Sequence, residues 1–176
     1  MQMWVFGYGS LLWNPGFDVA ESVIGSLDGY ARSFCMRSIH HRGTVEDPGL
    51  VLALDQSATA ACSGIALRVK DGQEVETLAY LRERELISSA YIEKELTILL
   101  QDRRSVTALV YVIDESHEQY CGGLPLEEQA QIIAAAVGGR GPNSEYLHNT
   151  ATHLTQVGLH DPDLDWLHNR VQALTS

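Results

Sequence analysis

The stretch WVFGYGSLLWNPG, residues 4–16, is an apolar run that ends at two glycines flanking a tyrosine. Aromatic and β-branched residues that stop at glycine predict a buried strand running into a tight loop. Because Gly7 and Gly9 have no Cβ, they permit positive φ and let backbone N–H groups converge on a small carboxylate or carbonyl group. The alternative interpretation is a structural turn in which Tyr8 fills the core.

The residues of this loop exclude three familiar site motifs. A dinucleotide-binding fingerprint needs a third glycine where Leu12 stands, and a phosphate-binding P-loop needs a Gly-Lys-Ser or Gly-Lys-Thr ending. A nucleophile elbow around Ser10 needs glycine at positions that Tyr8 and Leu12 occupy. A small ligand is therefore favoured over a nucleotide.

The composition predicts one globular domain over residues 1–176. Hydrophobic residues make up 45% of the chain and charged residues 20%, which is typical of a protein with a real core. There are 12 Lys and Arg against 23 Asp and Glu, giving a formal charge of -11, so nucleic acid is not an expected partner.

The cysteines and the apolar segments favour a cytoplasmic protein. Cys35, Cys62 and Cys121 lie far apart and are odd in number, so neither a disulfide framework nor a thiolate zinc site is indicated. We see no export signal and no apolar run approaching the about 18 residues that a membrane span needs. We therefore expect no membrane association.

Hydrophobic periodicity predicts strands followed mostly by helices, the order of an α+β protein. We expect strands within residues 3–8, 27–41, 51–55 and 63–69, and a hairpin of residues 90–100 and 105–114. We expect helices within residues 72–87, 125–137, 143–158 and 162–174. The expected apolar stripe of the first helix consists of Val75, Leu78, Leu81 and Leu86. Asn143 and Asp161 are expected N-caps.

The segment YLRERELISSAY, residues 80–91, contains a second candidate site. Its alternating arginines and glutamates are typical of a solvated helix face, and we assign Glu83 to that face. Glu85 lies at the junction between helix and strand, where a side chain can point into a cavity beside the sheet. Glu85 is therefore a candidate acid or base.

Five segments together resemble the ChaC-type, glutathione-specific γ-glutamylcyclotransferases over nearly the whole chain. They are, in the order of that family, VFGYGSLLWNPGF (5–17), HHRGT (40–44), YLRERELISSAY (80–91), CGGLPLEEQAQII (121–133) and GPNSEYLHN (141–149). The resemblance implies a γ-glutamylcyclotransferase-like fold: a small, mixed or antiparallel, barrel-like sheet with one helix between strands and further helices at the C-terminus.

The resemblance also implies an activity and its residues. The family closes the γ-glutamyl group of glutathione into 5-oxoproline and releases Cys-Gly, with no metal or cofactor. The loop of Tyr8, Gly9, Ser10 and Leu11 would bind the γ-glutamyl group. The glutamate of the family's Arg-Glu pair, its general base, corresponds to Glu85, and the flanking tyrosines favour this register over Glu83.

Three further residues are weaker candidates for substrate binding. Tyr91 corresponds to the tyrosine that closes the family's Arg-Glu segment. Arg42 is a candidate to pair with a substrate carboxylate, with a structural ion pair as the alternative. Tyr146 is a candidate to hydrogen-bond the γ-glutamyl group, with core packing as the alternative.

The chain departs from the family pattern beside Tyr91. Ser88, Ser89 and Ala90 stand where the family has at least one glycine, and Ile92 and Glu93 stand where basic or hydroxyl residues are usual. These departures leave two alternatives open. One is a cyclotransferase for other γ-glutamyl peptides or amines, and the other is a γ-glutamyl-binding module without activity.

Overall fold

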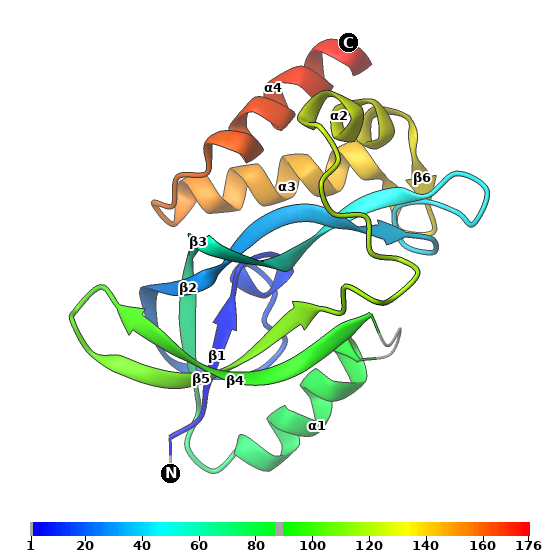
Figure 1. Ribbon diagram of the computed structural model, residues 1–176. Coiled ribbons are helices and arrows are strands. Elements are labelled where there is room, and N and C mark those ends of the chain that lie inside the picture. The colour runs from blue at the N-terminus through cyan, green and yellow to red at the C-terminus, as the bar shows by residue number, and fades with distance from the viewer. Residues whose placement is uncertain (1, 87–89) are drawn as a thin grey trace. The chain divides into compact units, whose positions relative to one another are not determined.

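Five strands of the computed structural model close a barrel, which is the core of an α+β fold (Figure 1). The structure describes residues 2–86 and 90–176, so Ser88 and Ser89 lie outside the described residues. The strands follow one another around the barrel in the order β1-β3-β2-β4-β5. They are Trp4–Gly7 (β1), Val19–Ser38 (β2), Gly49–Val69 (β3), Tyr91–Leu100 (β4) and Ser105–Ile113 (β5). The predicted fold class is confirmed.

The shortest strand, β1, lies between two longer ones. It pairs antiparallel with β3 and parallel with β5, which makes the sheet mixed. All four of its residues are buried. A continuous apolar run is what a strand covered on both faces requires, and the run that starts at Trp4 has this pattern.

The predicted hairpin is confirmed, whereas β3 differs from expectation. Strands β4 and β5 pair antiparallel from Tyr91 opposite Ile113 to Leu99 opposite Ser105, and they form the green hairpin of Figure 1. The two strands predicted at residues 51–55 and 63–69 are one strand, β3. The intervening residues are small or polar and mostly exposed, so they carry no apolar alternation although the strand continues.

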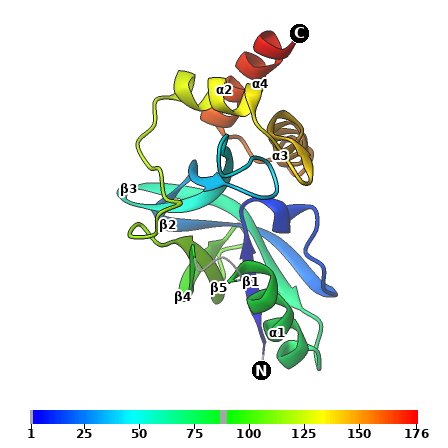
Figure 2. The ribbon, with the colours of Figure 1, turned by 90° about the vertical axis from the view of Figure 1, so that its right-hand side faces the viewer.

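Helix α1, Glu74–Glu85, packs against the barrel through only part of the predicted stripe. Thr77 and Leu81 are its buried residues, whereas Val75 is 86% exposed. Leu81 belongs to a core cluster with residues from β1, β3, β5 and a short 3-10 helix, Ser10–Leu12 (η1). These residues are Val5, Leu11, Val69 and Tyr111. Figure 2 shows α1 alongside β1.

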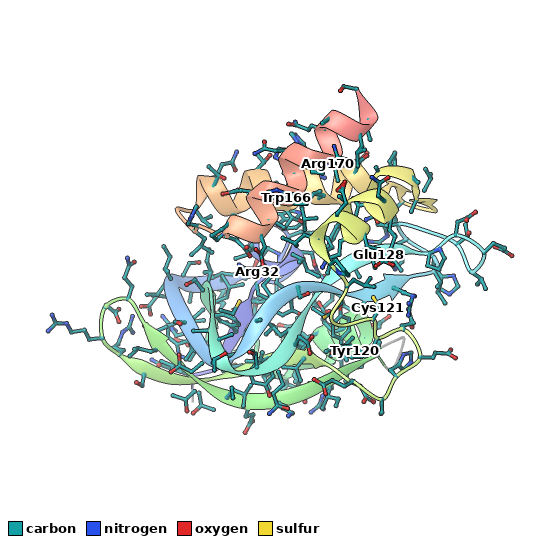
Figure 3. The ribbon with its side chains drawn as sticks, turned by 45° about the horizontal axis from the view of Figure 1, so that its top comes forward. Arg32, Tyr120, Cys121, Glu128, Trp166 and Arg170 are labelled. Atoms are coloured by element: carbon teal, nitrogen blue, oxygen red, sulfur yellow. The ribbon has the colours of Figure 1, made fainter. Side chains whose placement is uncertain are left out.

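Three helices follow the strands, as predicted. They are Leu126–Ala135 (α2), Asn143–Gln156 (α3) and Pro162–Thr175 (α4). Two short strands, Val137–Gly138 (β6) and Gly141–Pro142 (β7), form a small hairpin between α2 and α3. Arg170 on α4, labelled in Figure 3, forms an ion pair with Glu127 on α2. Asp161 is the N-cap of α4, as predicted, because its Oδ1 accepts the N–H of Leu164 at 3.1 Å.

The chain forms two compact units, each built from two segments. The first consists of Met1–Arg32 and Leu54–Glu118, and the second of Ser33–Ala53 and Gln119–Ser176. Strands β2 and β3 contribute residues to both units. The first unit contains β1, α1, β4 and β5, and the second contains α2, α3 and α4. The single domain expected from composition stays a prediction.

Asn143 does not cap α3, because Pro142 holds the N-cap position. Asn143 is instead fully buried, and its side chain pairs with the backbone of Leu50 in the same unit. Its Oδ1 accepts the N–H of Leu50 and its Nδ2 donates to the carbonyl of Leu50, both at 2.8 Å. A Cβ on the neighbouring Gly49 would lie 2.8 Å from this Oδ1, so glycine is required there. The amide acts as a neighbouring strand would, satisfying both backbone groups.

We predict that Asn143→Ala lowers the free energy of unfolding by about 2–4 kcal/mol, because it leaves two buried backbone groups of Leu50 without partners. Urea denaturation measures the change. Asn169→Ala, at an exposed position of α4, is the matched control and should change stability little. Equal effects of the two substitutions would contradict the structural role of Asn143.

Candidate active site

Glu85 lies on the buried face of α1, at the last residue of the helix. It follows the buried Leu81 by four residues, and residues four apart share one face of a helix. Its side chain is 16% exposed. Glu83, two residues earlier, points away from this face and is exposed. The helical period therefore separates the two glutamates that the sequence left as alternatives for the base.

The surroundings of Glu85 favour its protonated form. Burial raises the pKa of the Glu85 carboxyl, and the positive charge of Arg84 opposes this rise without cancelling it. The position at the C-terminus of α1 acts in the same direction as burial, because the partial negative charge of a helix C-terminus disfavours an anion. A carboxyl whose pKa is raised toward neutrality is suited to exchanging protons.

Arg84 links the end of α1 to the loop that follows β1. Its Nη1 donates to the carbonyls of Asn14, at 2.6 Å, and Pro15, at 3.1 Å. Its Nη2 donates to the hydroxyl of Ser10 at 3.1 Å, and its Nε lies 3.4 Å from Oε1 of Glu85. One guanidinium therefore contacts both the candidate base and the candidate binding loop.

The loop itself is built around a short 3-10 helix, Ser10–Leu12 (η1). Its first internal hydrogen bond runs from the N–H of Leu12 to the carbonyl of Gly9 at 2.9 Å. The N–H groups of Ser10 and Leu11 precede that bond, so the turn itself provides them with no acceptor. They are therefore candidate backbone donors for a ligand.

The positive φ expected of Gly7 and Gly9 is wrong. Gly9 has a φ of -141°, and Gly7 lies in β1 and is not among the glycines with positive φ. The reversal of the chain is achieved by the 3-10 turn instead. A Cβ on Gly7 would lie 3.3 Å from the backbone carbon of Leu11, so the missing side chain lets η1 fold back onto the end of β1. Glycine at position 7 therefore allows the backbone of Leu11 to approach the end of β1 closely.

The side chains of Tyr8 and Leu11 belong to the core. Tyr8 is 8% exposed, and its hydroxyl donates to the carbonyl of Tyr111 at 3.0 Å. Arg32 on β2, labelled in Figure 3, donates to the carbonyl of Tyr8 at 2.8 Å. Leu11 lies in the core cluster beneath α1. Among the four predicted loop residues, Ser10 is the one whose side chain contacts Arg84.

Tyr91 opens β4 and is partly buried against the same core cluster. Two residues further along, Glu93 accepts the hydroxyl of Tyr111 at 2.9 Å and pairs with Arg82 at 3.0 Å. Burial, followed by the hydrogen bond to Glu93 and then the charges of Glu93 and Glu85, raises the pKa of Tyr111, which keeps its hydroxyl neutral. Glu93, which departs from the family pattern, is thus a partner of Arg82 and Tyr111.

Arg42 and Tyr146 come together in the other compact unit. Nη1 of Arg42 donates to the carbonyl of Pro142 at 3.1 Å and lies 3.5 Å from Oε1 of Glu145. The guanidinium carbon is 5.9 Å from the centre of the Tyr146 ring. The hydroxyl of Tyr146 accepts the N–H of Leu52 at 3.1 Å. The structural ion pair considered for Arg42 is therefore present, and substrate binding by either residue stays a prediction.

The sequence interpretation missed Arg84 and Tyr80 as site residues. They lie four residues apart on α1, and the hydroxyl of Tyr80 accepts a hydrogen bond from Nη1 of Arg84 at 3.2 Å. This spacing was visible in the segment YLRERE, but their partners in the loop lie about 70 positions earlier in the chain. The charged run was assigned to a solvated face because such runs usually are.

Within residues 2–86 and 90–176, no cluster of three or more His, Cys, Asp or Glu side chains has the arrangement of a metal site. Among the described helices, none is long and apolar enough to cross a membrane. All three cysteines are buried, and none of them forms a disulfide within the described residues.

A closed barrel carrying a buried carboxyl beside a glycine-containing loop defines an α+β protein with a candidate acid–base site. The family model of ChaC-like proteins matches residues 3–174. The chain belongs to this family.

Relatives of known description cover most of the chain. A glutathione-specific gamma-glutamylcyclotransferase of Escherichia coli is 36% identical over 172 residues, covering 98% of this chain and 74% of the relative. Gamma-glutamylcyclotransferase 2-1 of Arabidopsis thaliana is 43% identical over 157 residues, covering 84% of this chain and 71% of the relative. The crystal structure of a glutathione-specific gamma-glutamyl cyclotransferase from yeast matches with a TM-score of 0.86 at 23% identity, over 100% of both chains. At this identity the structural match shows the shared fold.

We predict that Glu85→Gln stabilises the protein more near neutral pH than in acid. A carboxyl whose pKa is raised by folding binds its proton more tightly in the folded state, so wild-type stability falls as pH rises above the unfolded value. Glutamine does not ionise, so the variant does not lose stability in this way as pH rises. Melting temperatures of both proteins at about pH 4 and about pH 8 test this, one close to the reference glutamate pKa of about 4.3 and the other well above it. A difference in melting temperature that is independent of pH would contradict the burial of an ionisable Glu85.

Proposed function

We propose that this protein is a γ-glutamylcyclotransferase that cleaves glutathione to 5-oxoproline and Cys-Gly. Membership of the ChaC-like family and relatives described as glutathione-specific cyclotransferases support this substrate and reaction. The observation that carries the mechanism is the buried carboxyl of Glu85, which shares the guanidinium of Arg84 with the loop after β1.

The reaction is an intramolecular transfer that consumes no water. The α-amine nitrogen of the γ-glutamyl group attacks the γ-carbonyl carbon, forming the C–N bond of a five-membered lactam. The bond between that carbon and the cysteine nitrogen then breaks. Once the α-amine is neutral, one proton leaves its nitrogen as the lactam forms and one is gained by the leaving nitrogen, so a single group can carry it from one to the other.

Glu85 is the proposed carrier of this proton. The substrate α-amine has a reference pKa of about 7.7–8.0 and is largely protonated at neutral pH, so attack requires a base nearby. Because the pKa of Glu85 is raised, it lies closer to the pKa of the amine, and this suits the carboxyl to return the proton afterwards. Intramolecular attack supplies much of the remaining rate without a metal or a cofactor.

The loop after β1 is proposed to hold the γ-glutamyl group. The N–H groups at Ser10 and Leu11 are backbone donors for an oxygen of the substrate, either its α-carboxylate or the oxyanion of the tetrahedral intermediate. The hydroxyl of Ser10 bonds to Arg84, which also contacts Glu85, so one guanidinium connects the loop to the candidate base. Tyr8, by contrast, would support the loop from the core.

The remaining assignments are also proposals. Tyr91, Arg42 and Tyr146 are proposed as secondary substrate-binding residues on the strength of the family resemblance. We propose the cytoplasm as the site of action, since three buried cysteines without a disulfide suit a reducing compartment.

We predict that Glu85→Gln lowers kcat by roughly 10²–10⁴, the usual contribution of a positioned general base, while glutathione still binds. The purified protein is incubated with glutathione, and 5-oxoproline and Cys-Gly are quantified by mass spectrometry. Binding to the variant is measured by isothermal titration calorimetry. A parallel assay with other γ-glutamyl peptides and amines establishes which leaving groups are accepted.

Glu83→Gln is the matched control, since it makes the same chemical change on the exposed face of α1. It should leave kcat close to wild type. Loss of activity in Glu83→Gln with normal turnover in Glu85→Gln would reverse the assignment of the base. Full activity in both would contradict the mechanism.

We predict that Gly9→Val abolishes glutathione binding with little effect on the melting temperature. Gly9 precedes η1, so a β-branched side chain there would occupy the space in front of the N–H groups at Ser10 and Leu11. Calorimetric titration with glutathione and thermal denaturation measure the two properties separately. Unchanged affinity in a folded variant would show that the substrate does not approach this loop.

A further inference from the structure

The guanidinium of Arg84 is surrounded by oxygen atoms from two segments of the first unit. The loop after β1 supplies the Ser10 hydroxyl and the carbonyls of Asn14 and Pro15. Helix α1 supplies the Tyr80 hydroxyl and the Glu85 carboxylate. A guanidinium has five N–H donors in a rigid, planar fork. With its side chain 20% exposed, Arg84 directs this fork at the loop and the candidate base together.

Tyr80 and Gly16 form a second contact between the same segments. Gly16 has a φ of +77°, a conformation that side chains other than glycine rarely adopt. A Cβ at Gly16 would lie 2.6 Å from Cζ of the Tyr80 ring, so the ring packs directly on the glycine. This packing places the Tyr80 hydroxyl beside Arg84. The Trp-Asn-Pro-Gly segment and the Tyr-Leu-x-x-Arg-Glu segment are thus two halves of one contact.

We propose that Arg84 is a positioning residue for the cyclisation: it holds the loop of residues 10–16 in its substrate-binding conformation and fixes the Glu85 carboxylate next to that loop. This inference rests on the proposed function. Arg84 acts through the groups that it binds, because its donors are directed at protein oxygens.

The charges around Glu85 give Arg84 a second, electrostatic effect. Arg84 is the cation that opposes the effect of burial on the pKa of Glu85. Among the described residues, Tyr111 on β5 is a further titratable group that interacts with Glu85. Tyr111 is neutral and donates its hydroxyl to Glu93, which is paired with Arg82. Without the charge of Arg84, the pKa of Glu85 rises further, so the base becomes protonated at a higher pH.

Lysine and methionine at position 84 separate the two effects. Lysine keeps the positive charge but lacks the planar fork, so it cannot bond to the Ser10 hydroxyl and both loop carbonyls in the same way. Methionine removes the charge as well as the donors. Arg82→Met is the matched control, because it removes an ion-paired arginine two residues away on α1 whose partner is Glu93.

The experiment measures each variant in two ways. Hydrogen–deuterium exchange of residues 10–16 reports on the loop without requiring activity. The pH profile of kcat/KM for glutathione reports on the base. We expect Arg84→Met to speed loop exchange by roughly tenfold or more, through easier local opening, and to move the acid limb of the profile to higher pH. Arg84→Lys should speed loop exchange while leaving the acid limb close to wild type, and Arg82→Met should change neither.

Wild-type loop exchange in both Arg84 variants would overturn the positioning role. An acid limb that stays in place in Arg84→Met would overturn the electrostatic effect. If Arg84→Met fails to fold, Arg84→Lys decides the positioning role by its loop exchange. A wild-type protein that forms no 5-oxoproline would refute the proposed function, whereas the exchange data would still decide whether Arg84 holds the loop.

Discussion

The bonds of a single guanidinium, that of Arg84, hold the candidate site together. Two carbonyls at the end of the loop, a serine hydroxyl at its beginning and a carboxylate on α1 all face this group. A mostly buried cation is tolerated only where its donors are paired, so the loop and the helix end are each constrained by the need to satisfy Arg84. The core cluster beneath α1, with Leu81 from the helix and Leu11 from the loop, holds the same two segments together from the apolar side.

Burial of Glu85 illustrates how reactivity and stability oppose each other at this site. Helix α1 would be more favourable with an uncharged residue at its buried C-terminal position, because desolvation and the helix dipole both disfavour a carboxylate there. The same surroundings bring the carboxyl toward the pKa range in which it can take up and release a proton. A residue that weakens the fold while suiting the chemistry is typical of active sites.

Part of the family pattern is explained by packing within the second unit. Gly43, in the segment HHRGT, has no room for a Cβ because the backbone of Gly49 lies against it. Gly138 likewise has no room for a Cβ, because the backbone of Arg42 and Gly43 lies against it. Asn143, in the segment GPNSEYLHN, completes this region by pairing with Leu50. Similarity in these two segments therefore reflects close backbone packing at least as much as substrate binding.

The sequence by itself determined what depends on local pattern. Apolar runs and their period located β1, the hairpin of β4 and β5 and the helices, and the order of five segments identified the family. Interpretation of the sequence was wrong for features that depend on distant partners. Strand β3 continues through a polar stretch because neighbouring strands pair with it. Asn143 bonds to Leu50 instead of capping α3. Only the tertiary structure showed that the Glu85 side chain is mostly buried and that the missing side chain of Gly7 lets Leu11 pack against the backbone. It also showed that Arg84 binds carbonyls about 70 residues away. Burial and hydrogen bonding between distant segments arise from packing in three dimensions, which no local sequence pattern records.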